Sequence, residues 1–373
     1  MRTKKLSLYA AWVPLVGLMV VAGGCDRGGQ ATAPAQQPAD ASEAASKPDA
    51  AGDIRAAYHA VLDAAIGAQD DVVAEHGREP WGAAGVLRHP DFDAPAAGPL
   101  IDEQGLEREG FVAEVAITRT AAAALRTAGV VEKLAELTRA VGALDGDTEL
   151  DLSGTLDARA RDAYRMLACL AVDAEVNGIG APSGRDDYAT VIAGLDAMAR
   201  AQLQAGGEDA TTSNLVLLRF TDSLVLDAIA AGHMTRDRAR ALLGSARVAT
   251  DALRQRYLEA LPPGLLPESR PAMAGFWHAT RDARRLALAI EVHRREHGAL
   301  PAALDALVPG VLAEMPRDPH AEDGRYVYRR DETNPFAYVL YSVGPDGVDD
   351  GGVRTRRTFS PEPGTDLVLV PEG

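Results

Sequence analysis

The sequence predicts a mainly α-helical protein, in which an irregular helical bundle precedes a small α+β domain made of one long helix and a short antiparallel sheet. Hydrophobic residues make up 47% of the chain but aromatic residues only 5%, so alanine supplies much of the apolar content and favours helices. Residues 53–261 repeat amphipathic patterns of helical length, separated by glycine, proline and acidic turns. Alternating apolar patterns, which predict strands, occur near the C-terminus.

Residues 1–24 are predicted to be a secretory signal peptide. Arg2, Lys4 and Lys5 give it a basic start, and an apolar stretch runs from there to residue 21. A transmembrane anchor is the alternative, because the stretch is close to the ~20 residues that span a bilayer. The small residues before a cysteine favour the signal peptide.

The end of this segment, Ala22-Gly23-Gly24-Cys25, resembles the lipobox of bacterial lipoproteins, although Ala22 stands where leucine is commonest. The resemblance implies that acyl chains such as palmitate are attached to Cys25. They would anchor the protein in a membrane of the cell envelope, facing the periplasm. Whether that is the inner or the outer membrane stays open, and Asp26 after the cysteine favours the inner one.

Residues 25–52 are predicted to be the lipidated cysteine and a disordered linker, because residues 26–52 contain no Val, Ile, Leu or aromatic residue. The helical domain is expected at residues 53–265. Its helices are expected at residues 54–75, 106–144, 156–176, 188–205, 212–231 and 236–261. Thr235 is an expected N-cap, and Gly178, Gly206 and Gly232 are expected just beyond helix C-termini. Residues 215–229 are apolar nearly all round, which predicts a central helix.

The α+β domain is expected at residues 272–373. A helix at 272–297 is followed by strand patterns at 325–330, 336–342 and 367–370. The domain carries an ordered series of motifs: Ala283 to Ile290, His293-Arg294, Gly298, Pro301, Pro316-Arg317-Asp318-Pro319, Tyr326-Val327-Tyr328 and Tyr341-Ser342-Val343-Gly344-Pro345-Asp346-Gly347.

This series resembles the globular domain of the major pseudopilin of type II secretion, over about the last 100 residues. The resemblance implies a long helix, a short helix, a Pro-x-Asp-Pro turn, a small antiparallel sheet and a calcium-binding loop. The chain departs from that family because it lacks the short basic leader and the membrane-embedded helix that builds the filament. Overall it resembles bacterial envelope proteins that place a variable helical region before the same tail.

The helix at 272–297 is expected to be amphipathic, with Phe276, Ala283, Leu286 and Ile290 facing inward. The basic residues of the same helix are expected to be exposed; they are Arg281, Arg284, Arg294 and Arg295.

Two metal sites are conceivable in this domain. Asp346, Asp349 and Asp350, with Asp366 at the position of the family's late aspartate, offer the hard oxygen ligands that calcium prefers. The alternative is a metal-free Asp/Gly turn. Separately, His293, Glu296 and His297 spell the H-x-x-E-H pattern of zinc hydrolases, with two histidines four residues apart on one helical face. Cys169 lies among apolar residues and is expected to be buried and inert.

The net charge of −16 gives no electrostatic basis for nucleic-acid binding. The sequence therefore predicts a lipid-anchored, non-catalytic envelope protein. It is attached to the membrane through lipid on Cys25 and binds other envelope proteins, including secretion or pilus components. The alternative is a lipid-anchored zinc hydrolase that uses His293, Glu296 and His297 as its catalytic site.

Overall fold

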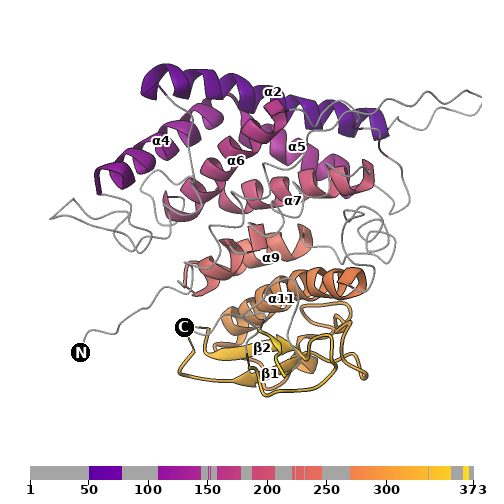
Figure 1. Ribbon diagram of the computed structural model, residues 1–373. Coiled ribbons are helices and arrows are strands. Elements are labelled where there is room, and N and C mark those ends of the chain that lie inside the picture. Colours follow the sequence, from indigo (N-terminus) through magenta and orange to yellow (C-terminus); the bar gives the residue numbers. More distant parts are fainter. Residues whose placement is uncertain are drawn as a thin grey trace, which may run out of the picture.

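The computed structural model describes residues 50–77, 108–143, 150, 152, 158–177, 187–205, 221–222, 224–230, 232–245, 269–334, 336–353 and 364–368. Over these residues the protein is mainly helical, with a small antiparallel sheet near the C-terminus, as the sequence predicts (Figure 1). No helix in this part of the chain is long and apolar enough to cross a membrane.

Five helices form the upper part of the molecule in Figure 1, which we call the helical body. They are α2 (Ala50–His76), α4 (Arg108–Thr127), α5 (Val130–Gly142), α6 (Ala158–Asn177) and α7 (Tyr188–Ala205). α5 packs between α2 and α7, while α4 packs against α2 and α6. The observed bounds of α2, α6 and α7 lie within four residues of the expected ones, 54–75, 156–176 and 188–205.

One prediction for the helical body is wrong. The single helix expected at 106–144 is two helices, because α4 ends at Thr127 and α5 begins at Val130. Gly129 between them has φ 71°, a left-handed conformation that a glycine adopts without steric cost. The turn lets α5 leave the direction of α4 and pack against α7.

After α7, residues 224–230 are also helical. Leu224, Val225 and Ile229 of this segment are buried in the core. This agrees with the central position predicted for residues 215–229, of which residues 215–220 and 223 lie outside the described part. Gly232 has φ 76°, as expected beyond a helix end. Thr235 is the N-cap of helix α9 (Arg236–Ser245), as expected, because its Oγ1 accepts a hydrogen bond from the N–H of Arg238 at 3.2 Å. Gly178 and Gly206 lie outside the described residues.

The C-terminal part of the molecule, which we call the tail, comprises α11, η1 and the sheet. It begins with the long helix α11 (Ser269–His297) and continues through the 3-10 helix η1 (Leu304–Leu307). The three-stranded sheet has the order β1-β2-β3 and both strand pairs are antiparallel. Its strands are β1 (Val327–Arg330), β2 (Tyr338–Ser342) and β3 (Leu367–Val368). The central strand β2 is buried along its whole length.

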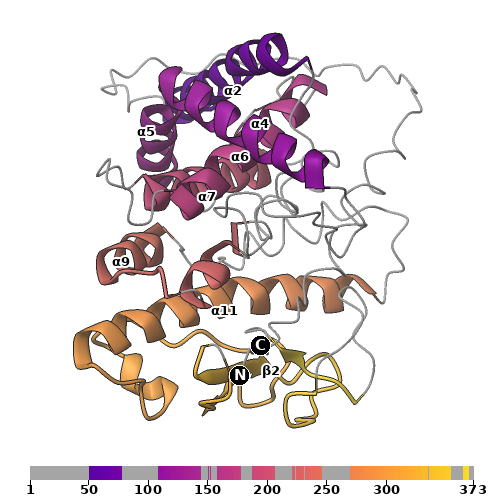
Figure 2. The same cartoon turned by 90° about the vertical axis from the view of Figure 1, so that its left-hand side faces the viewer.

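Helix α11 lies between the rest of the helices and the sheet. Figures 1 and 2 show α9 along one side of it and the sheet along the other. α11 contacts α9, η1 and β2. Its residues 286–290 are all buried, so the helix is covered from both sides.

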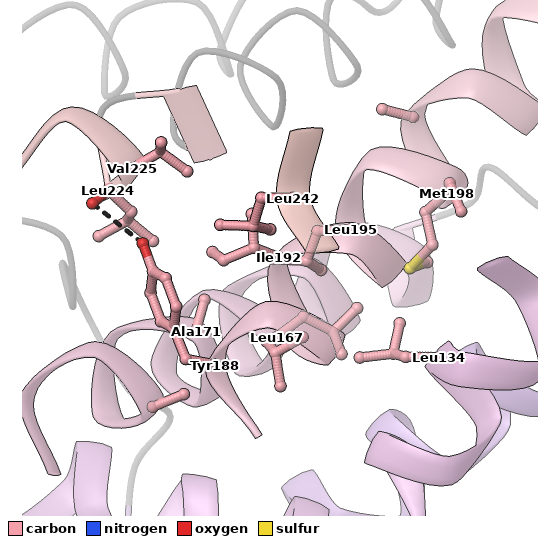
Figure 3. Packing of buried hydrophobic residues seen from close by; sticks show 14 of the residues in the cluster. Leu134, Leu167, Ala171, Tyr188, Ile192, Leu195, Met198, Leu224, Val225 and Leu242 are labelled. Atoms are coloured by element: carbon pink, nitrogen blue, oxygen red, sulfur yellow. Dashed lines mark hydrogen bonds between the residues drawn. The ribbon is translucent and has the colours of Figure 1, made fainter. Parts of the chain in front are cut away.

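The core of the helical body is built by close approach of small and branched side chains (Figure 3). Leu134, Ile192 and Leu195 are fully buried there. Gly194 of α7 permits the closest contact, because a Cβ atom at that position would lie 2.5 Å from the Cβ of Leu134. Tyr188 is also fully buried, and its hydroxyl donates a hydrogen bond to the carbonyl of Leu224 at 3.1 Å.

Candidate functional site

The side of α11 that faces the helical body carries a buried ion cluster. The Arg284 guanidinium is completely buried, so the prediction that Arg284 is exposed is wrong. Its Nη2 lies 2.6 Å from Asp196 of α7, and its Nη1 lies 3.0 Å from Asp222. Arg281 joins the cluster at 2.9 Å from Asp222, and its side chain is only 20% exposed, so the prediction that Arg281 is exposed is also wrong. A buried arginine is tolerated here because two carboxylates balance its charge.

The pKa values of the two carboxylates in this cluster are shifted in opposite directions. Burial would raise the pKa of Asp196, but the charges of Arg284 and Arg281 outweigh burial and hold that pKa below its ordinary value. Burial dominates at Asp222 and raises its pKa, although the same two arginines oppose the shift. Thr221 adds a hydrogen bond to Asp196 at 2.9 Å. The cluster therefore ties α11 to α7 of the helical body and to the segment of residues 221–222.

The opposite side of α11 is attached to the sheet through Asp282. The hydroxyl of Tyr326 donates a hydrogen bond to Asp282 Oδ2 at 2.9 Å, and His278 Nε2 lies 3.3 Å from the same oxygen. Both Asp282 and Tyr326 are buried. The predicted apolar stripe of this helix is confirmed for Ala283, Leu286 and Ile290, which are fully buried.

Arg294 and Arg295 turn toward one buried carboxylate on α11. Glu291 is 2% exposed and pairs with Arg294 at 2.6 Å and with Arg295 at 2.5 Å. The Arg295 side chain is 39% exposed, as expected, whereas that of Arg294 is 32% exposed and is therefore partly buried.

Asp318 of the Pro-x-Asp-Pro turn connects the turn to the central strand. Its carboxylate is 3% exposed and accepts hydrogen bonds from the Ser342 hydroxyl at 2.8 Å and from the N–H groups of His320 and Val343 at 2.9 and 3.3 Å. The aspartate thus pairs polar groups that the burial of this region would otherwise leave unsatisfied.

The backbone of the Asp/Gly loop, residues 344–353, donates hydrogen bonds to two carboxylates of the loop, Asp346 and Asp349, and to Asp366 beyond it. Asp366 is fully buried and accepts hydrogen bonds from the N–H groups of Gly352 at 2.6 Å and Asp350 at 3.3 Å. Burial raises the pKa of Asp366, and the charges of Asp349 and Asp350 add to that rise. Asp346 bonds to the N–H groups of Val348 and Gly364 at 3.2 and 3.1 Å.

These hydrogen bonds engage several of the carboxylate oxygens that are predicted as calcium ligands. Asp349 Oδ1 accepts hydrogen bonds from the Tyr341 hydroxyl and from the N–H of Gly351, both at 2.9 Å. Asp350 differs, because its Oδ2 is buried and has no hydrogen-bond partner among the described residues. Over the same residues, no three acidic, histidine or cysteine side chains are grouped closely enough to hold a metal ion.

The residues of the H-x-x-E-H pattern lie at the C-terminal end of α11. The rings of His293 and His297 stack with their centres 4.2 Å apart. Glu296 lies in an ion pair with Arg240 of α9, whose Nε is 3.0 Å from Glu296 Oε1. The pattern therefore brings the two histidines together, while the carboxylate that a hydrolase would use as general base is engaged by another helix.

The other predicted site residues divide into two groups. Cys169 is buried and makes no disulfide, as expected. Cys25, Asp26 and the rest of the predicted signal and linker up to residue 49 lie outside the described residues.

Asp196 and Asp222 were not singled out in the sequence. An acidic residue inside an apolar helical pattern was the available signal, and it does not reveal a partner far along the chain.

Comparison of the chain with protein-family models, with curated proteins and with solved structures finds no match.

Proposed function

We propose that the protein is a lipid-anchored, non-catalytic protein of the bacterial envelope that binds other proteins through its tail, among them components of type II secretion or pili. The observation that carries the proposal is the covering of α11. Arg284 is buried against the helical body and Asp282 is buried against Tyr326. A helix held on both sides is unavailable for packing into a filament, so the tail presents its sheet and loops to a partner.

The Asp/Gly loop is the favoured contact region. The large hydrophobic residues that are exposed in the described part of the chain are Val73 at 37%, Val348 at 54% and Val353 at 53%. Two of these three belong to the Asp/Gly loop, and Val73 lies on α2. Protein-binding surfaces commonly have apolar side chains at their centre and a polar rim.

Site-specific photo-crosslinking in cells tests this proposal. A photoreactive amino acid placed at Val348 or Val353 should give adducts with a secretion or pilus component, identified by mass spectrometry. The same group at Val73 is the matched control and should give none of these adducts. Equal labelling from all three positions, or no envelope protein captured at Val348 and Val353, would contradict the proposed function.

Lipid attachment at Cys25 is a separate part of the proposal and rests on the lipobox resemblance. Cys25→Ser should leave an unprocessed precursor and abolish incorporation of labelled palmitate. Cys169→Ser is the control, because Cys169 is buried and should not be acylated. Label that persists in Cys25→Ser would show that the anchor is not at this cysteine.

Calcium binding by Asp346, Asp349, Asp350 and Asp366 also belongs to the proposal. The buried, unpartnered Asp350 Oδ2 and the repulsion among Asp349, Asp350 and Asp366 support it, because a cation would relieve both. Calcium at a hundred times its dissociation constant should stabilise the protein by about 2.7 kcal/mol, with magnesium doing much less. Asp349→Ala with Asp350→Ala should remove the rise in melting temperature. An unchanged melting temperature of the wild type would leave the loop as a metal-free turn.

A further inference from the structure

The first end of the Asp/Gly loop is held by a carboxylate that lies outside the loop. Asp318 is 3% exposed and accepts hydrogen bonds from the Ser342 hydroxyl at 2.8 Å and from the N–H of Val343 at 3.3 Å. The Ser342 oxygen in turn accepts a hydrogen bond from the N–H of Gly344 at 3.3 Å. Gly344 has φ 74°, and a Cβ atom there would lie 3.1 Å from the carbonyl oxygen of Thr365. The backbone therefore enters the loop along a path that a buried side chain of another turn defines.

The second end of the loop is held by Asp366, which also lies outside it. The side chain of Asp366 is fully buried and accepts hydrogen bonds from the N–H groups of Asp350 at 3.3 Å and Gly352 at 2.6 Å. The N–H of Asp366 donates to the carbonyl of Val353 at 2.7 Å. One residue beyond the loop thus bonds to three of the last four residues of the loop.

Between these ends the loop is bonded to the sheet. The Tyr341 hydroxyl, on β2, donates a hydrogen bond to Asp349 Oδ1 at 2.9 Å. Arg329 of β1 donates from Nη2 to the carbonyl of Gly351 at 3.1 Å. Two strands therefore hold the middle of the loop, in addition to the two aspartates at its ends.

The exposed valines project from this bonded backbone. The N–H of Val348 donates to Asp346 Oδ1 at 3.2 Å, and the carbonyl of Val353 accepts the bond from Asp366. Their side chains are nevertheless 54% and 53% exposed. A surface that already has its bound conformation loses less conformational entropy on binding than a flexible loop does, and this difference favours affinity.

We propose that Asp318 and Asp366 are positioning residues, which hold the Asp/Gly loop in one conformation before a partner arrives and so present Val348 and Val353 together. This inference rests on the proposed protein-binding function and adds how the binding surface is prepared. It needs no bound cation, because each of the hydrogen bonds that hold the loop joins two groups of the chain itself.

Hydrogen exchange of the full-length protein, resolved to single amides by mass spectrometry, tests the positioning. A calcium chelator is present, so that no ion contributes to the order of the loop. Asp318→Asn and Asp366→Asn keep the size of the side chain but turn one acceptor oxygen into an NH₂ donor. Exchange should become about tenfold faster or more at residues 343–344 in Asp318→Asn and at residues 350–352 in Asp366→Asn, with the other end unchanged in each case.

Two further variants keep this test specific. Ser342→Ala removes the hydroxyl that connects Asp318 to Gly344, and it should accelerate exchange at Gly344 while Val343 keeps its bond to Asp318. Asp331→Asn is the matched control, because Asp331 accepts its hydrogen bonds from Thr333 in a different turn of the tail. It should leave exchange in the Asp/Gly loop unchanged.

Photo-crosslinking from Val348 and Val353 gives the functional readout. The yield of partner adducts from both positions should fall about threefold or more in Asp318→Asn and in Asp366→Asn, because the partner must then order the loop. A wild type without adducts would contradict the proposed function, and the exchange rates would still decide the positioning. Unchanged loop exchange in both variants, or equal acceleration at the two ends of the loop and in β1, would overturn the inference. Faster exchange with undiminished adduct yield would also overturn it, since the loop conformation would then be irrelevant to binding.

Discussion

The helical body and the tail use their buried carboxylates differently. Asp196 in the body and Asp222 in the segment that follows it pair with arginines that lie more than fifty residues away in the chain. In the tail, Asp318 and Asp366 mostly accept hydrogen bonds from backbone N–H groups, which lie 2 to 25 residues away in the chain. The first arrangement joins two parts of the molecule, whereas the second shapes a loop. The difference teaches that a buried acid can be an attachment between elements or a local organiser of the backbone.

The largest expected effect comes from breaking the attachment. Arg284→Met leaves Asp196 and Asp222 with Arg281 alone, and we expect a loss of about 3–5 kcal/mol in the free energy of unfolding. Urea denaturation measures it. The control is Arg240→Met, which removes a surface ion pair and should cost less than about 1 kcal/mol. A triple variant that also carries Asp196→Asn and Asp222→Asn should recover part of the loss, and equal costs for Arg284→Met and Arg240→Met would contradict the buried attachment.

Replacing Asp318 should lower the free energy of unfolding by less than Arg284→Met does. Asp318→Ala leaves the Ser342 hydroxyl and two backbone N–H groups without their acceptor, so we expect a loss of about 2–4 kcal/mol. Asp323→Ala is the control, because that exposed side chain accepts one bond from Arg325 N–H. Hydrogen exchange should rise in the tail alone for Asp318→Ala and in both α7 and the sheet for Arg284→Met. Faster hydrogen exchange in α7 in both variants would show that the effect of Asp318→Ala is not confined to the tail.

Packing of the helical body gives a smaller effect. Gly194→Ala would place a Cβ atom 2.5 Å from that of Leu134, and we expect the resulting overpacking to cost about 1–3 kcal/mol. Gly67→Ala in α2 is the matched control, because no atom lies within 4 Å of its added Cβ. That variant should gain about 0.5–1 kcal/mol from helix propensity. A stable Gly194→Ala protein, measured by thermal denaturation, would show that α5 and α7 are packed less closely.

The smallest effect is a pH dependence within the ion cluster. The folded pKa of Asp196 is lowered, so its contribution to stability is present above the ordinary value of 3.8 and is lost as pH falls through the folded pKa. The folded pKa of Asp222 is raised, so its contribution has the opposite sign and increases as pH falls. Asp196→Asn should therefore cost more than Asp222→Asn at pH 7, and the two costs should converge toward pH 3. Urea midpoints across this range that keep a constant difference would contradict the assigned shifts.

Several features of the fold could be predicted because their causes are local. The periodicity of α7 gave its bounds, Tyr188–Ala205, and Thr235 was recognisable as the N-cap of α9. The break at Gly129 was missed because a glycine inside a helical pattern is compatible with both a continuous helix and a turn. Tertiary packing of α5 against α2 and α7 decides between them.

The candidate sites also combine features with local causes and features that depend on tertiary packing. The spacing of His293 and His297 placed both on one face of a helix, and the alternation of Asp and Gly predicted a turn-rich loop. The engagement of Glu296 by Arg240 depends on two helices that meet only in the folded protein. The sequence likewise assigned Arg284 to the exposed side, because an arginine is normally solvated.

By itself, then, the sequence determined the mainly helical class, the strand patterns of the tail and the short turns at Asp346 and Asp349, since each depends on residues within a few positions of one another. The tertiary structure decided the burial of Arg284, its pairing with Asp196 and Asp222, and the attachment of α11 on both sides. Burial and ion pairing depend on which helices pack together, and that choice is made by the whole set of apolar surfaces. A charged residue can enter the core when opposite charges from distant elements meet it there.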